Sequence, residues 1–251
     1  MRNKWKWLIP LLILAILAGA FLIYTGSYYH ADASALAALD SDEAVTVIPT
    51  DYGWLLDGPS ETDALIFYPG AKVEETAYAP LLHGLAAQGM DVCLVKMPFR
   101  LAFFGLSRAD AVMAQHDYER WYIGGHSLGG AMAAIYAAGH ADRLAGVALL
   151  AAYPTKALDS GLRVLSLYGS EDGVLNRAKL EKGRPYMPPS ARECVIEGGN
   201  HAQFGNYGPQ AGDGAAAISA QEQQRRTADE ILQYFLTDEK DESVLSPAGA
   251  V

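Results

Sequence analysis

The Gly-His-Ser-Leu-Gly sequence at residues 125–129 constrains the fold of this chain more than any other feature. The short apolar run 121–123 before it is typical of a buried strand, and the alanine-rich segment 131–138 after it is typical of a buried helix. A serine between two glycines in this strand–turn–helix context indicates a nucleophile elbow, in which a strained turn exposes the hydroxyl. The alternative is a glycine-rich turn that only allows a helix to pack closely on a sheet.

Further apolar runs of strand length alternate with helix-like segments along the chain. Strands are expected at 44–48, 52–56, 64–68, 91–95, 144–151, 162–168 and 193–196, and helices at 79–88, 107–116, 175–182 and 215–236. Strands that are apolar throughout and alternate with helices are typical of a parallel sheet covered on both faces. The short connection 152–161 leaves no room there for a large lid. The sequence therefore predicts one α/β domain over residues 44–236.

The N-terminal segment has a different character from the predicted domain. Three basic residues among the first six precede an uncharged apolar run at 8–24. That run just reaches the length of a membrane-spanning helix and is longer than most signal-peptide cores. Because basic flanks stay cytoplasmic, residues 1–25 are expected to anchor an extracytoplasmic domain, the alternative being a cleaved signal and a secreted protein. Residues 26–43 are expected to form a linker, either as a tether or as a short helix, and 237–251 a disordered acidic tail.

The composition excludes some partners and cofactors. With 19 basic and 29 acidic residues, the formal charge is −10, which argues against binding to nucleic acid and against electrostatic attachment to anionic lipid. The two cysteines, Cys93 and Cys194, lie in strand-like runs and are expected to be buried thiols rather than a disulfide. Their spacing fits no zinc motif, and we expect no metal site.

Ser127 requires a base that accepts its proton, and imidazole does this best near neutral pH. Among six histidines, His201 is the one that follows a strand end after the serine. The carboxyl ends of parallel strands meet at one edge of a sheet, so His201 is expected close to Ser127. A carboxylate must then fix the tautomer of the histidine. Asp172, just beyond another strand end, is the candidate, and the adjacent Glu171 is the alternative.

Two further groups of residues are candidates for contacts with substrate. A developing oxyanion requires backbone N–H donors, for which the amides of Leu128 and Ala71 are the candidates. The loop after His201 contains Phe204 and Tyr207. These aromatic residues either form a wall of the substrate pocket or hold His201 in place.

The motifs at 125–130, 169–172 and 198–201 make the chain resemble the α/β-hydrolase superfamily. Over residues 44–236 it looks most like small, lidless members that are similar to dienelactone hydrolases and carboxylesterases. This resemblance implies an eight-stranded, mostly parallel sheet and cofactor-free hydrolysis through an acyl-serine. The chain departs from many relatives at Pro69-Gly70, where they carry His-Gly after the third strand. It also lacks the cysteine nucleophile of dienelactone hydrolases, so their specificity does not follow.

The expectation from the sequence is a membrane-anchored serine hydrolase that cleaves a carboxylic ester of modest size. A thioesterase, peptidase or acyltransferase would use the same three residues, and the lack of a lid argues against an interfacially activated lipase. A hypothesis from another class is a catalytically silent scaffold that acts as a binding module at the cell surface. The sequence does not specify the oligomeric state.

Overall fold

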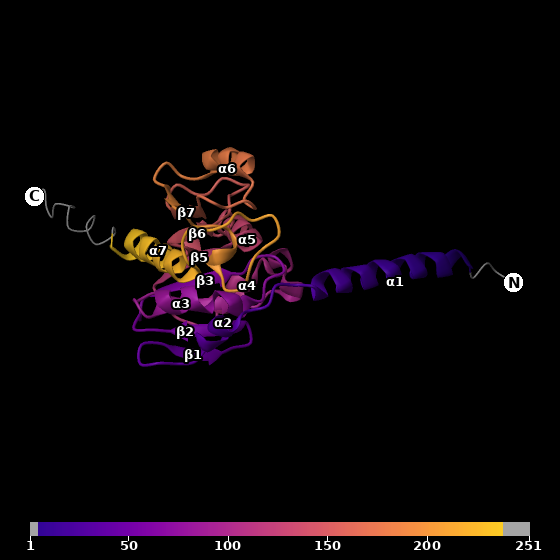
Figure 1. Ribbon diagram of the computed structural model, residues 1–251, viewed down its shortest axis with the longest axis horizontal. Helices are drawn as coiled ribbons and strands as arrows, with labels where there is room; N and C mark the ends of the chain where they lie inside the picture. The colour runs from indigo at the N-terminus through magenta and orange to yellow at the C-terminus, as the bar shows by residue number, and fades with distance from the viewer. Residues whose placement is uncertain (1–4, 238–251) are drawn as a thin grey trace, which may run out of the picture.

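The apolar runs of the sequence form the centre of an eight-stranded sheet in the computed structural model, which describes residues 5–237 (Figure 1). The strands are β1 (Thr46–Pro49), β2 (Gly53–Asp57), β3 (Asp63–Tyr68), β4 (Asp91–Val95), β5 (Arg120–His126), β6 (Gly146–Leu150), β7 (Arg163–Gly169) and β8 (Arg192–Ile196). Their order in the sheet is β1-β2-β4-β3-β5-β6-β7-β8. The pairs β1–β2 and β2–β4 are antiparallel and the others parallel, which confirms the predicted fold class.

Helices cover both faces of this sheet. The helices of the described chain, of which α1 lies outside these layers, are α1 (Trp5–Gly26), α2 (Ala33–Ala37), α3 (Ala79–Ala86), α4 (Arg108–Met113), α5 (Leu128–Ala137), α6 (Arg177–Gly183) and α7 (Ala220–Leu232). Short 3₁₀ turns are η1 (Glu75–Tyr78), η2 (Pro98–Arg100), η3 (Ala102–Gly105), η4 (Ala141–Arg143), η5 (Arg184–Tyr186) and η6 (Ala202–Phe204), and η7 (Gln233–Thr237) is a π-helical turn. Helices α3 and α7 pack together on one face, whereas α4 and α5 cover the other.

The central strand β3 shows why two hydrophobic cores form. All six of its residues are buried, and successive side chains point to opposite faces of the sheet. Leu65 and Phe67 therefore join the core under α3 and α7, whereas Ala64, Ile66 and Tyr68 join the core under α5. A strand buried on both faces is apolar along its length, which is the pattern found at 64–68, and the buried Asp63 at its start is paired with Arg120.

Two predicted segments differ in the structure. The C-terminal helix begins at Ala220 rather than at residue 215, because the Ser219 side chain accepts the N–H of Glu222 and caps it. Residues 26–43, expected as a linker, pack onto the domain. The Tyr29 N–H donates to the Lys72 carbonyl at 2.7 Å, and Ala35 is fully buried. Of the expected tail 237–251, all but Thr237 lies outside the described residues.

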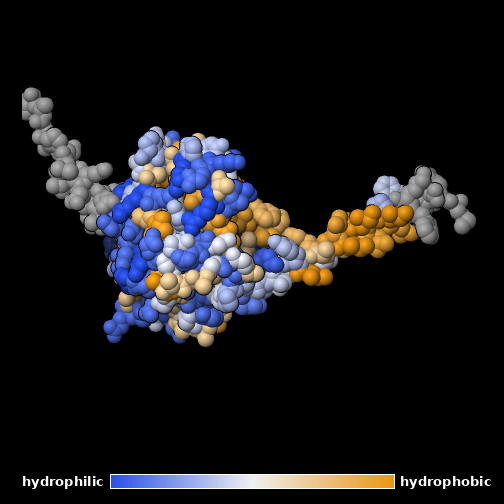
Figure 2. Space-filling model, turned by 45° about the horizontal axis from the view of Figure 1, so that its top comes forward, coloured by the Kyte–Doolittle hydropathy of each residue, from blue (hydrophilic) through white to orange (hydrophobic). Residues whose placement is uncertain are grey.

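Helix α1 projects away from the domain (Figures 1 and 2). Its segment Trp7–Gly26 is, among the described residues, the one helix long and apolar enough to cross a membrane. Most of its large apolar side chains are exposed in the isolated chain. This helix has the properties of a membrane anchor and equally those of a signal sequence.

Both cysteines are free thiols, as expected. Cys93 is buried in β4, whereas Cys194 in β8 is only half-buried, because β8 is the edge strand of the sheet. Four strands lie between β4 and β8 in the sheet order, so the two thiols cannot approach one another.

A buried carboxyl group begins β4. The Asp91 side chain is inaccessible to solvent, with the Gly58 N–H donating to Oδ1 at 2.9 Å and the Tyr118 hydroxyl donating to Oδ2 at 2.7 Å. Burial, together with the nearby Asp57 carboxylate, raises the pKa of Asp91 from 3.8 to about 6. The folded protein therefore retains this proton over a pH range in which the unfolded chain releases it.

We expect Asp91→Asn to weaken the pH dependence of stability. Since the folded-state pKa is the higher one, the wild type loses stability as the pH rises from about 4 to about 6, and the loss persists above that range. An asparagine carries no charge and keeps both hydrogen bonds, since it accepts from Gly58 and donates to the Tyr118 oxygen. Urea unfolding at several pH values in this range should show the free energy of unfolding of the variant rising relative to that of the wild type as the pH rises. A constant difference between the two free energies would contradict the raised pKa.

Candidate active site

Ser127 lies on the turn between β5 and α5 with a strained backbone, φ 53° and ψ −120°. A positive φ is rare for any residue with a side chain and is found mainly where the surrounding structure enforces it. Here the Ser127 N–H donates to the Leu150 carbonyl of β6 at 2.9 Å, and the Ser127 carbonyl accepts the N–H of Ala131 in α5. These two bonds hold the serine at the carboxyl end of β5.

The glycines on either side of Ser127 are required by space. A Cβ at Gly125 would lie 2.3 Å from the Tyr68 carbonyl oxygen, and one at Gly129 would lie 2.0 Å from the same oxygen. Both contacts are far shorter than any real Cβ makes with a backbone atom. The turn therefore packs directly against the end of β3, and only glycine fits at these two positions.

Asp172 and His201 come together at the same edge of the sheet. The Nδ1 atom of His201 lies 2.9 Å from Oδ2 of Asp172, and both side chains are buried. The other carboxylate oxygen, Oδ1, accepts the N–H groups of Val174 at 2.9 Å and Leu175 at 2.7 Å. With the carboxylate fixed in this way, the ring of His201 is held by Nδ1. Among the described residues, its Nε2 has no hydrogen-bond partner.

Residues not singled out by the sequence analysis hold the loop of His201. Asp213 accepts the backbone N–H groups of His201 at 3.2 Å and Ala202 at 2.8 Å, and also that of Gly173 at 3.1 Å. It thereby ties the loop of the histidine to the loop of Asp172. In α7, the buried Gln223 exchanges two hydrogen bonds with the backbone of Asn200. The carboxylate of Asp213 is visible in the sequence, but its backbone partners are not.

A cavity of about 230 Å³ contains both Ser127 and His201 in its lining. Its other residues come from the loops after β6 and β7 and from the start of α5, and most are small or apolar: Leu128, Ala131, Ala151, Ala152, Tyr153, Val174, Leu175 and Asn176. The structure thus brings the serine and the histidine to one site, with Asp172 behind the histidine. Glu171, the alternative carboxylate, is exposed and accepts the hydroxyl of Ser170.

The two candidate oxyanion donors lie in different positions. Leu128 lines the cavity and is the first residue of α5, so its N–H points out of the helix N-terminus. Ala71 follows β3 in a turn where the Lys72 N–H donates to the Arg100 carbonyl and the Gly70 N–H donates to the Tyr78 hydroxyl. Ala71 is half-buried and is not among the residues that line the cavity.

Phe204 and Tyr207 are buried and do not line this cavity. The ring of Phe204 packs against that of His126 at 5.5 Å, and the ring of Tyr207 packs against that of Tyr29 at 5.5 Å. His126 in turn contacts the ring of His201 at 4.4 Å. Phe204 and Tyr207 therefore lie where packing residues would lie, rather than in a wall of the substrate pocket.

His126 is a second imidazole next to His201, but it is held neutral. The Tyr78 oxygen accepts the N–H of Gly70 at 3.1 Å and shares a hydrogen bond of 2.8 Å with Nδ1 of His126. Burial lowers the pKa of His126 well below its ordinary value, and a charge on His201 lowers it further. His126 therefore does not compete with His201 for a proton.

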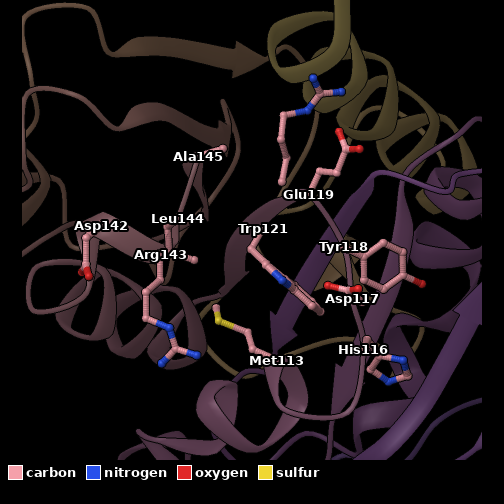
Figure 3. Close-up of a pocket in the computed structure, with 11 residues that line it drawn as sticks. Met113, His116, Asp117, Tyr118, Glu119, Trp121, Asp142, Arg143, Leu144 and Ala145 are labelled. Atoms are coloured by element: carbon pink, nitrogen blue, oxygen red, sulfur yellow. The ribbon is translucent and has the colours of Figure 1, made fainter.

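A larger hollow of about 520 Å³ lies at the opposite edge of the sheet, before β5 and β6 (Figure 3). Trp121 lies in its middle, between Met113 and Tyr118. Its arginines are held in ion pairs, Arg143 with Asp110 and Arg120 with Asp63. The hollow contains no arrangement of nucleophile and base like that at Ser127. Among residues 5–237, no group of three His, Cys, Asp or Glu side chains is placed to hold a metal ion.

A mostly parallel sheet with helices on both faces, and a serine on a strained turn after its central strand, define the α/β-hydrolase architecture. The sequence agrees with this class, because the model of the alpha/beta hydrolase family matches residues 64–225. The chain belongs to that family. A search of the curated proteins found no significant sequence match.

Solved structures with the same fold include several hydrolases. The chain is similar to carboxylesterase CesB from Bacillus subtilis, with a TM-score of 0.55, 10% identity, and coverage of 87% of this chain and 99% of that one. For a CIB-like hydrolase from Thermoplasma acidophilum the TM-score is 0.55, with 14% identity and coverage of 75% and 98%. For dienelactone hydrolase from Anabaena variabilis the TM-score is 0.53, with 13% identity and coverage of 78% of this chain and 99% of that one. At these identities the likeness concerns the fold alone.

Proposed function

We propose that the protein is a serine hydrolase that cleaves a carboxylic ester with Ser127, His201 and Asp172. The observation that carries this proposal is the buried His201–Asp172 pair, whose free Nε2 belongs to a ring lining the same cavity as the strained serine. A buried carboxylate that accepts Nδ1–H fixes the tautomer in which Nε2 accepts a proton. His126 also has a buried Nε2 without a hydrogen-bond partner among the described residues, but of these two histidines only His201 has a carboxylate, that of Asp172, at its Nδ1.

The reaction follows from these positions. Oγ of Ser127 attacks the carbonyl carbon of the ester while Nε2 of His201 takes the hydroxyl proton. When the tetrahedral intermediate collapses, the bond to the alcohol oxygen breaks, and His201 returns the proton to the departing oxygen. Water then attacks the acyl-serine and loses a proton to His201. When this second tetrahedral intermediate collapses, the acid is released and His201 returns the proton to Oγ of Ser127. Asp172 remains ionised and stabilises the imidazolium during both steps.

The negative oxygen of the intermediate needs donors at a fixed position. We assign the first to the amide of Leu128, which lies at the N-terminus of α5, where the helix dipole also favours negative charge. We assign the second to the amide of Ala71, in the turn after β3. This second assignment requires the turn 70–72 to face the carbonyl of the bound substrate.

The cavity favours an ester with a small acyl group. At about 230 Å³ it is smaller than typical sites for drug-sized ligands, which span roughly 300–1,000 Å³. Alanines 131, 151 and 152 keep its walls shallow and apolar. A thioester or an activated amide would react by the same steps. The rates for these substrates should be compared with those for esters in one kinetic assay. We further propose that α1 anchors the protein with the catalytic domain on the extracytoplasmic side.

Labelling with a fluorophosphonate tests this proposal against a catalytically silent scaffold. The reagent phosphonylates only a serine whose hydroxyl is activated by a neighbouring base. We expect one covalent adduct on the full-length protein, located at Ser127 by peptide mass spectrometry. Failure to label, under conditions in which a known serine esterase in the same sample reacts, would favour the silent scaffold.

A further inference from the structure

Three exposed phenylalanines form an apolar surface at the base of α1. Phe99, Phe103 and Phe104, here called the aromatic patch, are each about half exposed. Their rings contact one another, with centroids of Phe103 and Phe104 at 4.2 Å and those of Phe99 and Phe104 at 5.5 Å. Figure 2 shows hydrophobic residues both along α1 and on the part of the domain from which α1 emerges. Half-exposed aromatic residues gathered in this way are typical of an interaction surface.

The aromatic patch lies beside the last turns of α1. The Phe21 ring of α1 contacts those of Phe99 at 5.1 Å and Phe104 at 5.9 Å. Phe21 is five residues before the end of the helix at Gly26, which corresponds to about 7.5 Å along the axis. If α1 spans a bilayer, the patch therefore lies at the depth at which interfacial aromatic residues enter the headgroup region, about 5–10 Å.

The short connection between α1 and the domain leaves the domain little freedom to tilt away from the end of the helix. Only Ser27 and Tyr28 separate the helix from Tyr29, which pairs with the loop after β3: its N–H donates to Lys72 and its carbonyl accepts from Glu74. Two cation–π contacts add to this attachment, Lys72 over the Tyr24 ring and Arg100 over the Tyr28 ring. The domain is thus fixed to the helix end.

Basic residues lie next to Phe99 of the aromatic patch on a chain that is acidic overall. Arg100 and Arg108 line the same hollow as Phe99, together with Asp51 and with Lys96, which forms an ion pair with Glu75. Cations around exposed aromatic rings complement the phosphates of lipid headgroups. The backbone of Phe99 and Arg100 also has positive φ, 55° and 58°, a strained arrangement that keeps the Phe99 ring against α1.

This attachment is at the catalytic edge of the sheet. The loops that contact α1 follow β3 and β4, and Ser127 follows β5; these three strands are mutually parallel, so their carboxyl ends meet at one edge. Within that edge η3, which contains Phe103 and Phe104, packs against α5, the helix that begins next to Ser127. A bilayer that contacts the aromatic patch therefore lies next to the catalytic loops.

We propose that the aromatic patch inserts into the lipid–water interface beside α1 and holds the catalytic edge against the bilayer. The substrate is then an ester of an amphiphile that resides in that interface, with its acyl or alcohol group presented from the membrane rather than from bulk water. The assignment of the substrate rests on the proposed hydrolase function, whereas the docking of the patch does not.

The docking is tested on the full-length protein in bilayers of phosphatidylcholine and phosphatidylglycerol. An environment-sensitive nitrobenzoxadiazole label is attached at Phe103→Cys or, as a matched control, at Tyr186→Cys, which replaces another half-exposed aromatic residue far from α1. The unmutated chain, treated in parallel, gives the background from Cys194. We expect blue-shifted emission and quenching by nitroxide-bearing lipids at position 103 but not at 186. Water-like, unquenched emission at both positions would overturn the proposal.

The substrate class is tested by a ratio of activities. For Phe103→Ser/Phe104→Ser we expect kcat/KM for the acetate of a nitrophenol that carries a long alkyl chain and resides in the bilayer, divided by that for soluble nitrophenyl acetate, to fall about tenfold. Phe103→Leu/Phe104→Leu should retain most of the ratio, since leucine also inserts, and an unchanged ratio in the serine variant would refute the substrate class. If the wild type cleaves neither ester, the proposed function fails, and the fluorescence measurement still decides the docking.

Discussion

Ser127→Ala is expected to lower the kcat for nitrophenyl acetate by about 10⁴- to 10⁶-fold while leaving the fold intact. The substitution removes the attacking oxygen, and Ser127 is the only serine or threonine among the described residues that line the cavity with His201. Alanine adopts the backbone of Ser127 as readily as serine does, and no hydrogen bond of the serine side chain is lost, so the free energy of unfolding should change little. Steady-state kinetics and thermal unfolding of the two proteins provide the measurement.

Ser166→Ala provides the matched control for this experiment. Ser166 is also a buried serine next to the catalytic loops, but it lies within β7, and its hydroxyl has no hydrogen-bond partner among the described residues. Its removal should leave kcat/KM unchanged. Undiminished turnover in Ser127→Ala would show that the chemistry does not depend on the serine of the elbow. An equal loss of turnover in Ser166→Ala would show that the loss is not specific to Ser127.

The parts of this molecule that the sequence predicts are those with local signals. Five of the six buried residues of β3, those at 64–68, appear as an unbroken apolar run, which is typical of a strand buried on both faces. Gly125 and Gly129 appear in the sequence because a backbone oxygen lies where a Cβ would be. The position of His201 just after β8 follows from the rule that loops meet at one edge of a parallel sheet.

The parts that the sequence does not predict depend on backbone groups or on distant contacts. Residues 26–43 are polar and rich in alanine, which is typical of a linker, yet Tyr29 pairs with the loop after β3 through main-chain bonds that any residue can make. Asp213 is one more acidic residue in a loop until its partners, three N–H groups of two other loops, are known. The aromatic patch has no helical or strand period, so its exposure is known only from the fold.

Asp172→Asn is expected to lower kcat by about 10⁴-fold with the His201 loop in place. The asparagine keeps its Oδ1 as acceptor for Val174 and Leu175, which places its NH₂ group 2.9 Å from Nδ1 of His201. That NH₂ can only donate, so Nδ1 must accept, and the ring proton moves to Nε2. A protonated Nε2 in a neutral ring cannot take the proton of Ser127, and activity is lost although every heavy atom keeps its position.

Glu171→Gln is the variant that separates the two candidate carboxylates. Glu171 is adjacent in sequence but exposed, and its contact is with Ser170 rather than with the histidine. The Glu171→Gln variant should therefore retain the wild-type kcat. Both this variant and Asp172→Asn should unfold at the same urea concentration as the wild type. If the glutamine variant loses activity and the asparagine variant does not, Glu171 becomes the partner of His201 during turnover, and the loop 170–173 must rearrange when substrate binds. Because the Asp172 carboxylate also accepts two backbone N–H groups, such a rearrangement would leave those groups without an acceptor, which is the physical reason we expect the opposite result.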